Sequence, residues 1–150
     1  MKESESKKGD KPKYLLDTSA LMALSEDEAG ADVVSDILAR AQKNAASVYI
    51  SFISVMEACY KVHQQRGEEA AQRIFHSLSH LPVKRIDVDD QLILSASSMK
   101  AQYAVSMADA WILATAKFFD AKLVHKDPEF EQLKETIPQI ILPYKSPKLK

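Results

Sequence analysis

The architecture of the protein follows from one stretch near the start of the chain, Tyr14-Leu15-Leu16-Asp17-Thr18-Ser19-Ala20-Leu21. Its first three residues form an apolar run that is typical of a short buried strand. Asp17 ends this run, and the apolar residues that follow it recur at helical spacing. A strand that passes into a helix through a polar residue is the opening unit of an α/β fold with a mostly parallel sheet.

The rest of the chain repeats this alternation of apolar runs and helical patterns. After the first strand and a brief helix over 20–24, the patterns predict strands at 48–52, 83–88, 123–124 and 139–142. They predict helices at 32–43, 54–66, 68–81, 90–103, 107–119 and 128–133. No internal repeat divides the chain, so we expect one α/β domain.

Three further acids stand where a predicted strand gives way to a helix or where a helix begins: Glu57, Asp109 and Asp127. The carboxyl ends of parallel strands meet at one edge of a sheet, so these acids and Asp17 are expected to share a crevice. Gathered carboxylates repel one another unless a cation neutralises them, and hard oxygen ligands suit Mg²⁺ or Mn²⁺. The pattern therefore predicts a divalent-metal site.

Each acid also has a purely structural interpretation. Ser54-Val55-Met56-Glu57 has the form of a capping box, and Ser106 to Asp109 has a similar form. Asp127-Pro128 pairs an N-cap aspartate with proline at the first helical position. Asp17 could cap the brief helix, and the hydroxyls of Thr18 and Ser19 could be turn residues or could support a carboxylate. Helix capping does not, however, require four acids to meet at one edge.

Composition restricts the class of protein. The 150 residues are 46% hydrophobic and 27% charged, which is typical of a globular domain, and no run approaches the roughly 20 apolar residues of a membrane-spanning helix. We expect a disordered tail over 1–12, one folded domain over 13–144 and a basic tail over 145–150. The single cysteine, Cys59, fits a reducing cytoplasm. A net charge of −1 means that any polyanion must be held by a local patch or through a bound metal.

A carboxylate-bound divalent ion is suited to phosphodiester hydrolysis, because it can activate a water molecule and stabilise the leaving oxygen. Two other classes of protein remain open. Receiver-type signalling domains also gather acids around Mg²⁺ at strand ends, although Asp17-Thr18-Ser19 lacks their early acid pair. A catalytically silent module that binds RNA or protein is the other alternative.

Four segments of the chain together resemble the PIN domain, and most closely the VapC-type toxins of toxin–antitoxin pairs. They are Tyr14 to Leu21, Ser54 to Ala58, Ala108 to Ala116 and Leu123 to Phe130, and the likeness extends from about Lys13 to Pro143. The resemblance implies a three-layer α/β/α fold, a Mg²⁺- or Mn²⁺-dependent endoribonuclease acting on RNA, a homodimer and a small antitoxin partner.

The resemblance also assigns roles to individual residues. The family's four acids correspond to Asp17, Glu57, Asp109 and Asp127, and its hydroxyl after the first acid corresponds to Thr18 or Ser19. The chain departs from the family at His125, where the family often has Thr or Ser two positions before its last acid. This histidine could bind metal or phosphate, and the simpler interpretation is a hydrogen-bonded residue of the core.

Two other groups of residues compete with these acids for a functional role. His63, His76 and His80 lie on the predicted helical hairpin and are interpreted as exposed surface residues. The pair Asp89-Asp90 is interpreted as the N-terminal cap of the helix that follows it.

Overall fold

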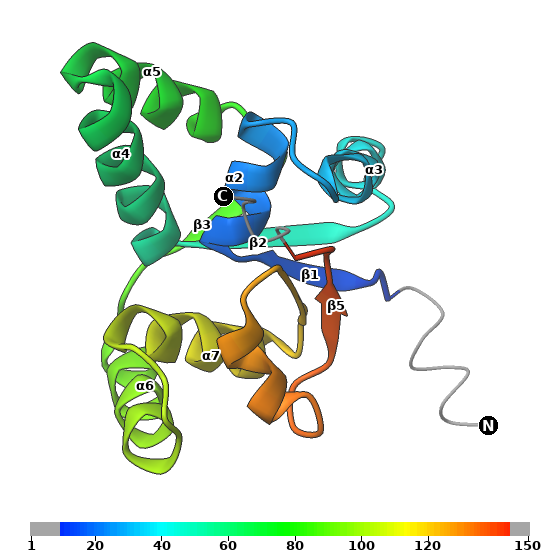
Figure 1. Cartoon of the computed structure of the whole chain (residues 1–150). Coiled ribbons are helices and arrows are strands. Elements are labelled where there is room, and N and C mark those ends of the chain that lie inside the picture. The colour runs from blue at the N-terminus through cyan, green and yellow to red at the C-terminus, as the bar shows by residue number, and fades with distance from the viewer. Residues whose placement is uncertain (1–9, 145–150) are drawn as a thin grey trace.

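The sheet of this protein has five strands, all of them parallel. The computed structural model describes residues 10–144, and Figure 1 shows its path from the first strand to the last. The strands are β1 (Lys13–Leu16), β2 (Ser47–Ser51), β3 (Lys84–Ile86), β4 (Lys122–His125) and β5 (Gln139–Ile141). Their spatial order is β3-β2-β1-β4-β5, and every neighbouring pair is parallel.

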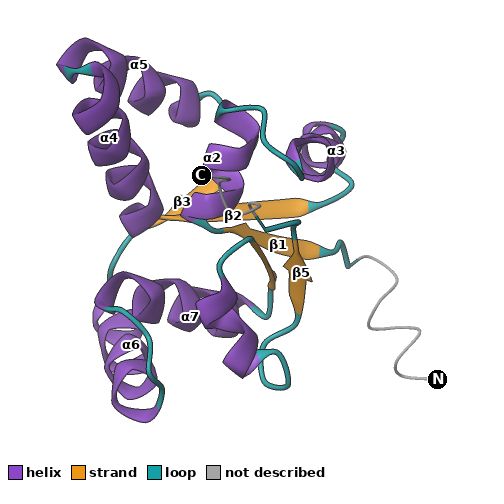
Figure 2. Ribbon diagram, viewed as in Figure 1, coloured by secondary structure: helices purple, strands orange, loops and turns teal. Residues whose placement is uncertain are grey.

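Helices cover both faces of the sheet, which makes the three layers predicted from the sequence (Figure 2). The helices are α2 (Thr18–Ser25), α3 (Ala31–Gln42), α4 (Phe52–Arg66), α5 (Glu68–Ser79), α6 (Asp90–Gln102), α7 (Met107–Phe119) and the 3₁₀ helix η1 (Pro128–Leu133). Residues of α2 to α5 pack in one hydrophobic core, and residues of α6, α7 and η1 pack in the other.

The strand β1 belongs to both cores. Leu16 packs with the core of α2 to α5, whereas Leu15 packs with the core of α6, α7 and η1, and both side chains are fully buried. Successive side chains of a strand point to opposite faces of the sheet, so a central strand in a three-layer fold must be apolar throughout. This requirement explains the uninterrupted apolar run that precedes Asp17.

The order of the strands places a crevice beside β1. From β1 the chain adds β2 and β3 on one side, then crosses over to add β4 and β5 on the other side. Ligands of open α/β sheets bind at such a switch point, outside the carboxyl ends of the strands. Receiver-type domains have the order 2-1-3-4-5 instead, so the topology contradicts the receiver-type alternative.

Most predicted elements are confirmed to within two residues at each end. The helix at Met107–Phe119 has the predicted bounds, and Gly67 joins α4 to α5.

The N-terminal tail predicted over 1–12 differs in part: the Pro12 carbonyl accepts a hydrogen bond from the Ser47 amide at 2.9 Å, so Pro12 packs with the folded domain. The expectations for residues 1–9 and for the basic tail at 145–150 concern parts of the chain outside the described residues. Among residues 10–144, no helix has the length and apolar content needed to cross a membrane.

Candidate metal centre

Asp17 lies at the switch point itself, between the ends of β1 and β4. Its backbone amide donates to the Val124 carbonyl at 3.0 Å, which ties the two strands together where they end. Its side chain accepts from the Ser19 amide at 3.0 Å and from the Ser19 hydroxyl at 2.5 Å, so Asp17 caps α2 as well. Burial raises the pKa of Asp17, its hydrogen bonds with Ser19 oppose the shift, and the charges of Asp127 and Glu57 add to it. An acid in this position favours a cation beside it.

Glu57 is held against α2 by a side-chain hydrogen bond. The Thr18 hydroxyl donates to Glu57 Oε1 at 2.6 Å and thereby links α2 to α4. The capping-box interpretation of Glu57 is wrong, because β2 runs directly into α4 and Ser51 is the N-cap, accepting from the Ile53 amide at 3.2 Å. Ser54 is a buried residue within the helix. Glu57 therefore lies in the second turn of α4 and takes no part in its cap.

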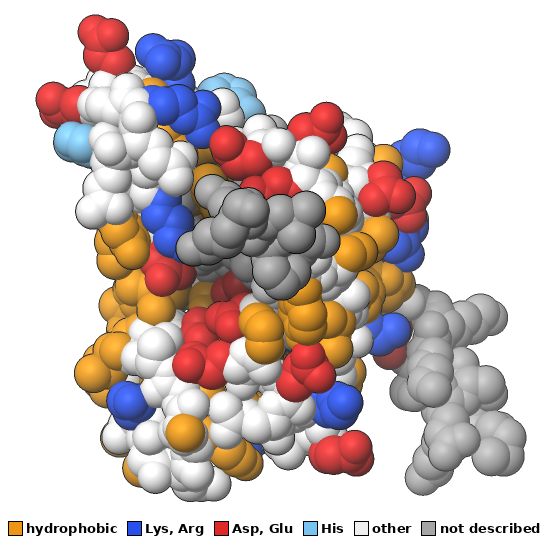
Figure 3. Space-filling view, viewed as in Figure 1, with side chains coloured by type: hydrophobic (Ala, Val, Ile, Leu, Met, Phe, Trp, Pro, Cys, Tyr) orange, Lys and Arg blue, Asp and Glu red, His pale blue; other side chains and the backbone are white. Residues whose placement is uncertain are grey.

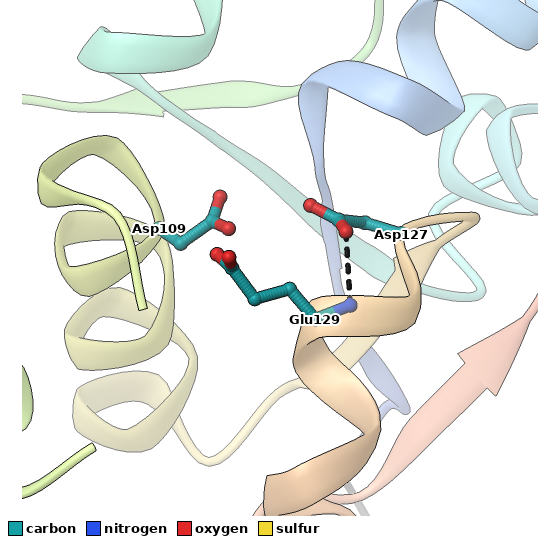
Figure 4. Close-up of side chains that lie close together, drawn as sticks. All are labelled: Asp109, Asp127 and Glu129. Carbon is teal, nitrogen blue, oxygen red and sulfur yellow. Dashed lines mark hydrogen bonds between the residues drawn. The ribbon is translucent and has the colours of Figure 1, made fainter. Parts of the chain in front are cut away.

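Asp109 and Glu129 face each other across the crevice (Figure 4). Asp109 is the third residue of α7, and its amide donates to the cap residue Ser106 at 3.1 Å, which confirms the predicted cap. Burial raises the pKa of Asp109 to about 9, and the hydrogen bond to Glu129 and the charges of Asp17, Asp127 and Glu129 reinforce the shift. The pKa of Glu129 is lowered, chiefly because the Asp109 carboxyl donates to it. These opposite shifts favour the neutral form of Asp109 and the charged form of Glu129.

Asp127 completes the group of carboxylates. It caps η1 by accepting from the Glu129 amide at 3.0 Å, with Pro128 at the first helical position as predicted. One side-chain oxygen from each of Asp109, Asp127 and Glu129 lies within 4.8 Å of the others. Figure 4 shows Asp109 on α7 facing Asp127 and Glu129 on the segment that follows β4. Caps and metal ligands are thus compatible roles for the same side chains.

Glu129 was not predicted from the sequence. It is exposed, and its carboxylate accepts from the Ser106 amide at 3.1 Å, which fixes it beside the start of α7. The signal that could have found it is its spacing, because a second acid two residues after Asp127 must lie at the same strand end. The sequence predicted a cap and a site role for Asp127 but no role for Glu129.

The side chains of His125 and Lys126 form no hydrogen bond with the carboxylates of the site. His125 is fully buried and hydrogen-bonded on both ring nitrogens, to the Asp127 amide at 3.0 Å and to Gln139 at 2.7 Å, which confirms the simpler interpretation of this residue. The Lys126 ammonium lies 3.4 Å from Glu28 and donates to the Ala29 carbonyl at 3.0 Å. The Lys126 amide donates to the Ser19 hydroxyl at 3.0 Å, so only its backbone reaches the site.

The competing residues lie outside the site. Asp89 caps α6 by accepting from the Leu92 amide at 2.8 Å, as predicted. His76 and His80 are exposed, and the His80 ring contacts the backbone carbonyl of His76 at 2.8 Å. The acids at the switch point are therefore the best supported candidate site.

The acids of the site form no ion pair with a basic side chain of residues 10–144, although the charge of Lys100 contributes to the lowered pKa of Glu129. Each ion pair found among residues 10–144 lies elsewhere and involves none of Asp17, Asp109, Asp127 and Glu129. Figure 3 shows acidic side chains gathered near the middle of one face of the molecule. Clustered carboxylate oxygens with an excess of negative charge fit a hard divalent cation such as Mg²⁺ or Mn²⁺.

Several solved structures share this fold. A toxin–antitoxin complex from Klebsiella pneumoniae matches with 24% identity and a TM-score of 0.60, covering 79% of this chain and 90% of that chain. VapBC2 from Rickettsia felis, bound to a DNA fragment from its promoter, matches with 18% identity and a TM-score of 0.69, covering 87% and 99%. VapC20 from Mycobacterium tuberculosis, a sarcin–ricin-loop-cleaving toxin, matches with 16% identity and a TM-score of 0.65, covering 87% and 99%. At these identities the likeness establishes the fold.

The sequence itself identifies the family. A search of curated proteins gave no significant match. The model of the PIN domain family, in contrast, matches residues 14–136, which include all the acids of the site and most of the sheet. The chain therefore belongs to the PIN domain family.

Proposed function

We propose that this protein is a divalent-metal-dependent endoribonuclease, acting in the cytoplasm as the toxin of a toxin–antitoxin pair. The observation that carries the proposal is the meeting of Asp109, Asp127 and Glu129 within 4.8 Å at the switch point of a PIN fold. Asp17 is buried beside them, and its pKa responds to the charges of Asp127 and Glu57. This concentration of negative charge supports a cation-binding site.

The proposed site consists of the four predicted acids together with Glu129. Asp17, Asp109, Asp127 and Glu129 would hold Mg²⁺ or Mn²⁺ directly or through water, and Glu57 would orient water from its place on α4. A divalent ion held by these residues would lower the pKa of a bound water and would stabilise the leaving oxygen of the phosphodiester. The Ser19 hydroxyl keeps Asp17 oriented, and the Thr18 hydroxyl keeps Glu57 oriented. The products would be a 3′-hydroxyl and a 5′-phosphate.

RNA is the proposed substrate, and a polar groove supports its path. The groove has a volume of about 460 Å³, and its lining includes two acids and two lysines: Ser19, Met22, Glu26, Glu28, Tyr60, Lys61, Gln64, Gln65 and Lys126. It begins at Ser19, whose hydroxyl contacts Asp17. Lys61 lies one helical turn after Glu57 and can bind a backbone phosphate, while Tyr60 is 44% exposed and can stack on a base.

The test of this proposal is RNA cleavage in Mn²⁺ by the parent, by Asp17→Asn and by Asp109→Asn. We expect each variant to lose cleavage at least 100-fold while remaining folded, because an amide is a poorer ligand than a carboxylate. Asp36→Asn, on the exposed surface of α3, is the matched control and should cleave like the parent. Cleavage by either site variant at the parental rate would remove that residue from the mechanism. RNA binding by the parent without metal and without cleavage would favour the silent module.

The partner of the toxin would be a small antitoxin. Structures similar to this one include toxin–antitoxin complexes, and the groove between α2 and α4 offers a polar surface next to the acids. Expression of the protein alone should arrest growth, and Asp17→Asn should relieve the arrest. Co-expression of a short reading frame adjacent to the gene should relieve it as well, and its product should co-purify with the chain. Unimpaired growth would contradict the toxin role and leave the nuclease test unaffected.

A homodimer is also proposed, with α6 and α7 as its interface. A groove of about 400 Å³ between these helices is lined mainly by apolar residues, among them Ile93, Met107 and Trp111. Ile93 is 46% exposed and Met107 is 67% exposed, which is unusual for large apolar side chains on one face. A dimer that buries them should be separated by Met107→Glu in sedimentation, whereas Met56→Glu on α4 is the control.

A further inference from the structure

We infer that His125 is a positioning residue for Asp127, and that Gln139 on the neighbouring strand β5 sets the ring tautomer that this role requires. His125 ends β4 and is fully buried, so its ring cannot reach solvent. Its Nδ1 lies 3.0 Å from the Asp127 amide nitrogen, and its Nε2 lies 2.7 Å from Gln139 Oε1. The catalytic meaning of the inference rests on the proposed function, but the positioning itself does not.

The direction of each hydrogen bond follows from its neighbour. The Gln139 Nε2 group donates to the Phe130 carbonyl at 2.8 Å, which leaves the Gln139 carbonyl oxygen facing the histidine ring. That oxygen can only accept, so His125 Nε2 carries the proton. In the neutral ring Nδ1 is then an acceptor, and the backbone N–H of Asp127 donates to it. Three bonds in series therefore specify one tautomer.

The ring is fixed by packing as well as by hydrogen bonds. It lies edge-on to Phe130 with 5.0 Å between ring centroids, and the His125 carbonyl accepts from the Leu142 amide at 2.7 Å. The bond from Asp127 N–H to a side chain two residues earlier has the form of an Asx or ST turn, in which an oxygen normally accepts. Here an imidazole nitrogen takes the place of that oxygen.

The turn that His125 closes carries two of the site carboxylates. Asp127 uses its own side chain to accept from the Glu129 amide at 3.0 Å, so orientation passes from Gln139 through His125 to Asp127 and then to Glu129. Groups that orient metal ligands in this way change metal affinity by roughly 10- to 100-fold when they are removed. Gln139 therefore affects the site from another strand without contacting any of its acids.

The test compares His125→Leu, His125→Asn and Gln139→Leu with the parent, using Mn²⁺ affinity by calorimetry and hydrogen exchange of the Asp127 amide by NMR. His125→Leu removes the acceptor and should weaken Mn²⁺ binding by about 10-fold or more. His125→Asn supplies an acceptor at the same turn and should recover most of the affinity. Gln139→Leu removes the group that selects the tautomer, so the neutral ring can also carry its proton on Nδ1, where it no longer accepts from the Asp127 amide. This variant should weaken Mn²⁺ binding several-fold. Ile37→Ala, in the core of α3, is the control for lost stability alone and should bind Mn²⁺ like the parent.

Hydrogen exchange separates this inference from the proposed function. Measured without metal, the Asp127 amide should exchange at least 10-fold faster in His125→Leu than in the parent, and His125→Asn should restore its protection. Equal protection of this amide in the parent and in folded His125→Leu or Gln139→Leu would overturn the inference, whether or not the protein binds Mn²⁺. Failure of the parent to bind Mn²⁺ or to cleave RNA would overturn the nuclease proposal instead.

Discussion

Individual side chains in this protein combine a structural role with a place in the site. Asp17 caps α2 and Asp127 caps η1, and both use the carboxylate that also faces the crevice. Helix N-termini offset part of the negative charge, by about 0.3–1 kcal/mol each. That contribution is too small to balance several acids, and the pKa of Asp109 is raised, first by burial and then by its hydrogen bond to Glu129 and the charges of the neighbouring acids. Stability is thus reduced at the residues that would bind the metal.

Replacement of Asp109 by Asn should make the metal-free protein more stable at high pH. The folded protein keeps the Asp109 proton up to about pH 9, whereas an unfolded chain loses it near pH 4. Between these values the folded state binds more protons, so the free energy of unfolding of the parent falls as pH rises. We expect Asp109→Asn to raise the free energy of unfolding at pH 8 by about 1 kcal/mol, a modest gain because water screens the crevice side of the carboxyl.

Urea unfolding in EDTA at pH 5 and pH 8 measures this effect. The difference in free energy between Asp109→Asn and the parent should be larger at pH 8 than at pH 5. Asp36→Asn, on an exposed face, should show the same small difference at both pH values. A variant that is less stable than the parent at pH 8 would show that Asp109 is charged in the folded protein and balanced by a partner.

The elements around the crevice are joined by a few side-chain bonds at their ends. The Thr18 hydroxyl connects the first turn of α2 with the second turn of α4 through Glu57, and Thr18 itself is only 3% exposed. Thr18→Val keeps the shape of the side chain but removes the donor. We expect it to lower the free energy of unfolding by about 1.5–2 kcal/mol, the usual contribution of a hydrogen bond to a charged group.

Thr18→Ser separates the hydrogen bond from the packing around it. It keeps the hydroxyl and loses one methyl group, so its Mn²⁺ affinity should equal that of the parent, whereas Thr18→Val should bind Mn²⁺ several-fold more weakly. Calorimetry on the two variants provides the comparison. Equal affinities in both would mean that Glu57 needs no support from α2.

The elements were predictable where periodicity alone determines them. The apolar run before Asp17 and the helix at Met107–Phe119 each have one arrangement that buries their apolar side chains. The start of α4 was misplaced because β2 passes into α4 without a loop, so Ser51 rather than Ser54 is the cap. A cap at either serine satisfies local rules, and the choice depends on where the strand must end in the sheet.

The candidate site was predictable in its location but not in its complete membership. The ends of the parallel strands β1 and β4 bring Asp17 and Asp127 together, and the first turn of α7 adds Asp109. Glu129 joins them through the tight 3₁₀ turn after Asp127, and a sequence pattern does not distinguish that turn from an ordinary helix. The role of His125 depends on Gln139, which is 14 residues away in sequence and adjacent only once β5 has paired with β4.

The whole molecule concentrates negative charge at one edge of a sheet while its net charge is only −1. If RNA is the substrate, long-range attraction would bring little of it to the protein, and contact with phosphate would have to be made near the proposed metal ion or near Lys61. The raised pKa of Asp109 favours its neutral form, which lowers the negative charge of the site. Binding of the proposed metal ion would then have to displace this proton.

Mn²⁺ binding to the whole protein should therefore release a proton and strengthen as pH rises. A metal ligand must be deprotonated, and Asp109 keeps its proton up to about pH 9, so the ion has to displace it at neutral pH. We expect about one proton released per ion at pH 7 and an affinity that increases by up to 10-fold per pH unit towards pH 9. Calorimetry in two buffers with different ionisation enthalpies measures the proton count. Asp109→Asn is the control, because it has no proton to release at this position. Proton release that persists in this variant would assign the coupling to another acid of the site. A parent affinity that does not depend on pH would contradict a raised pKa of Asp109.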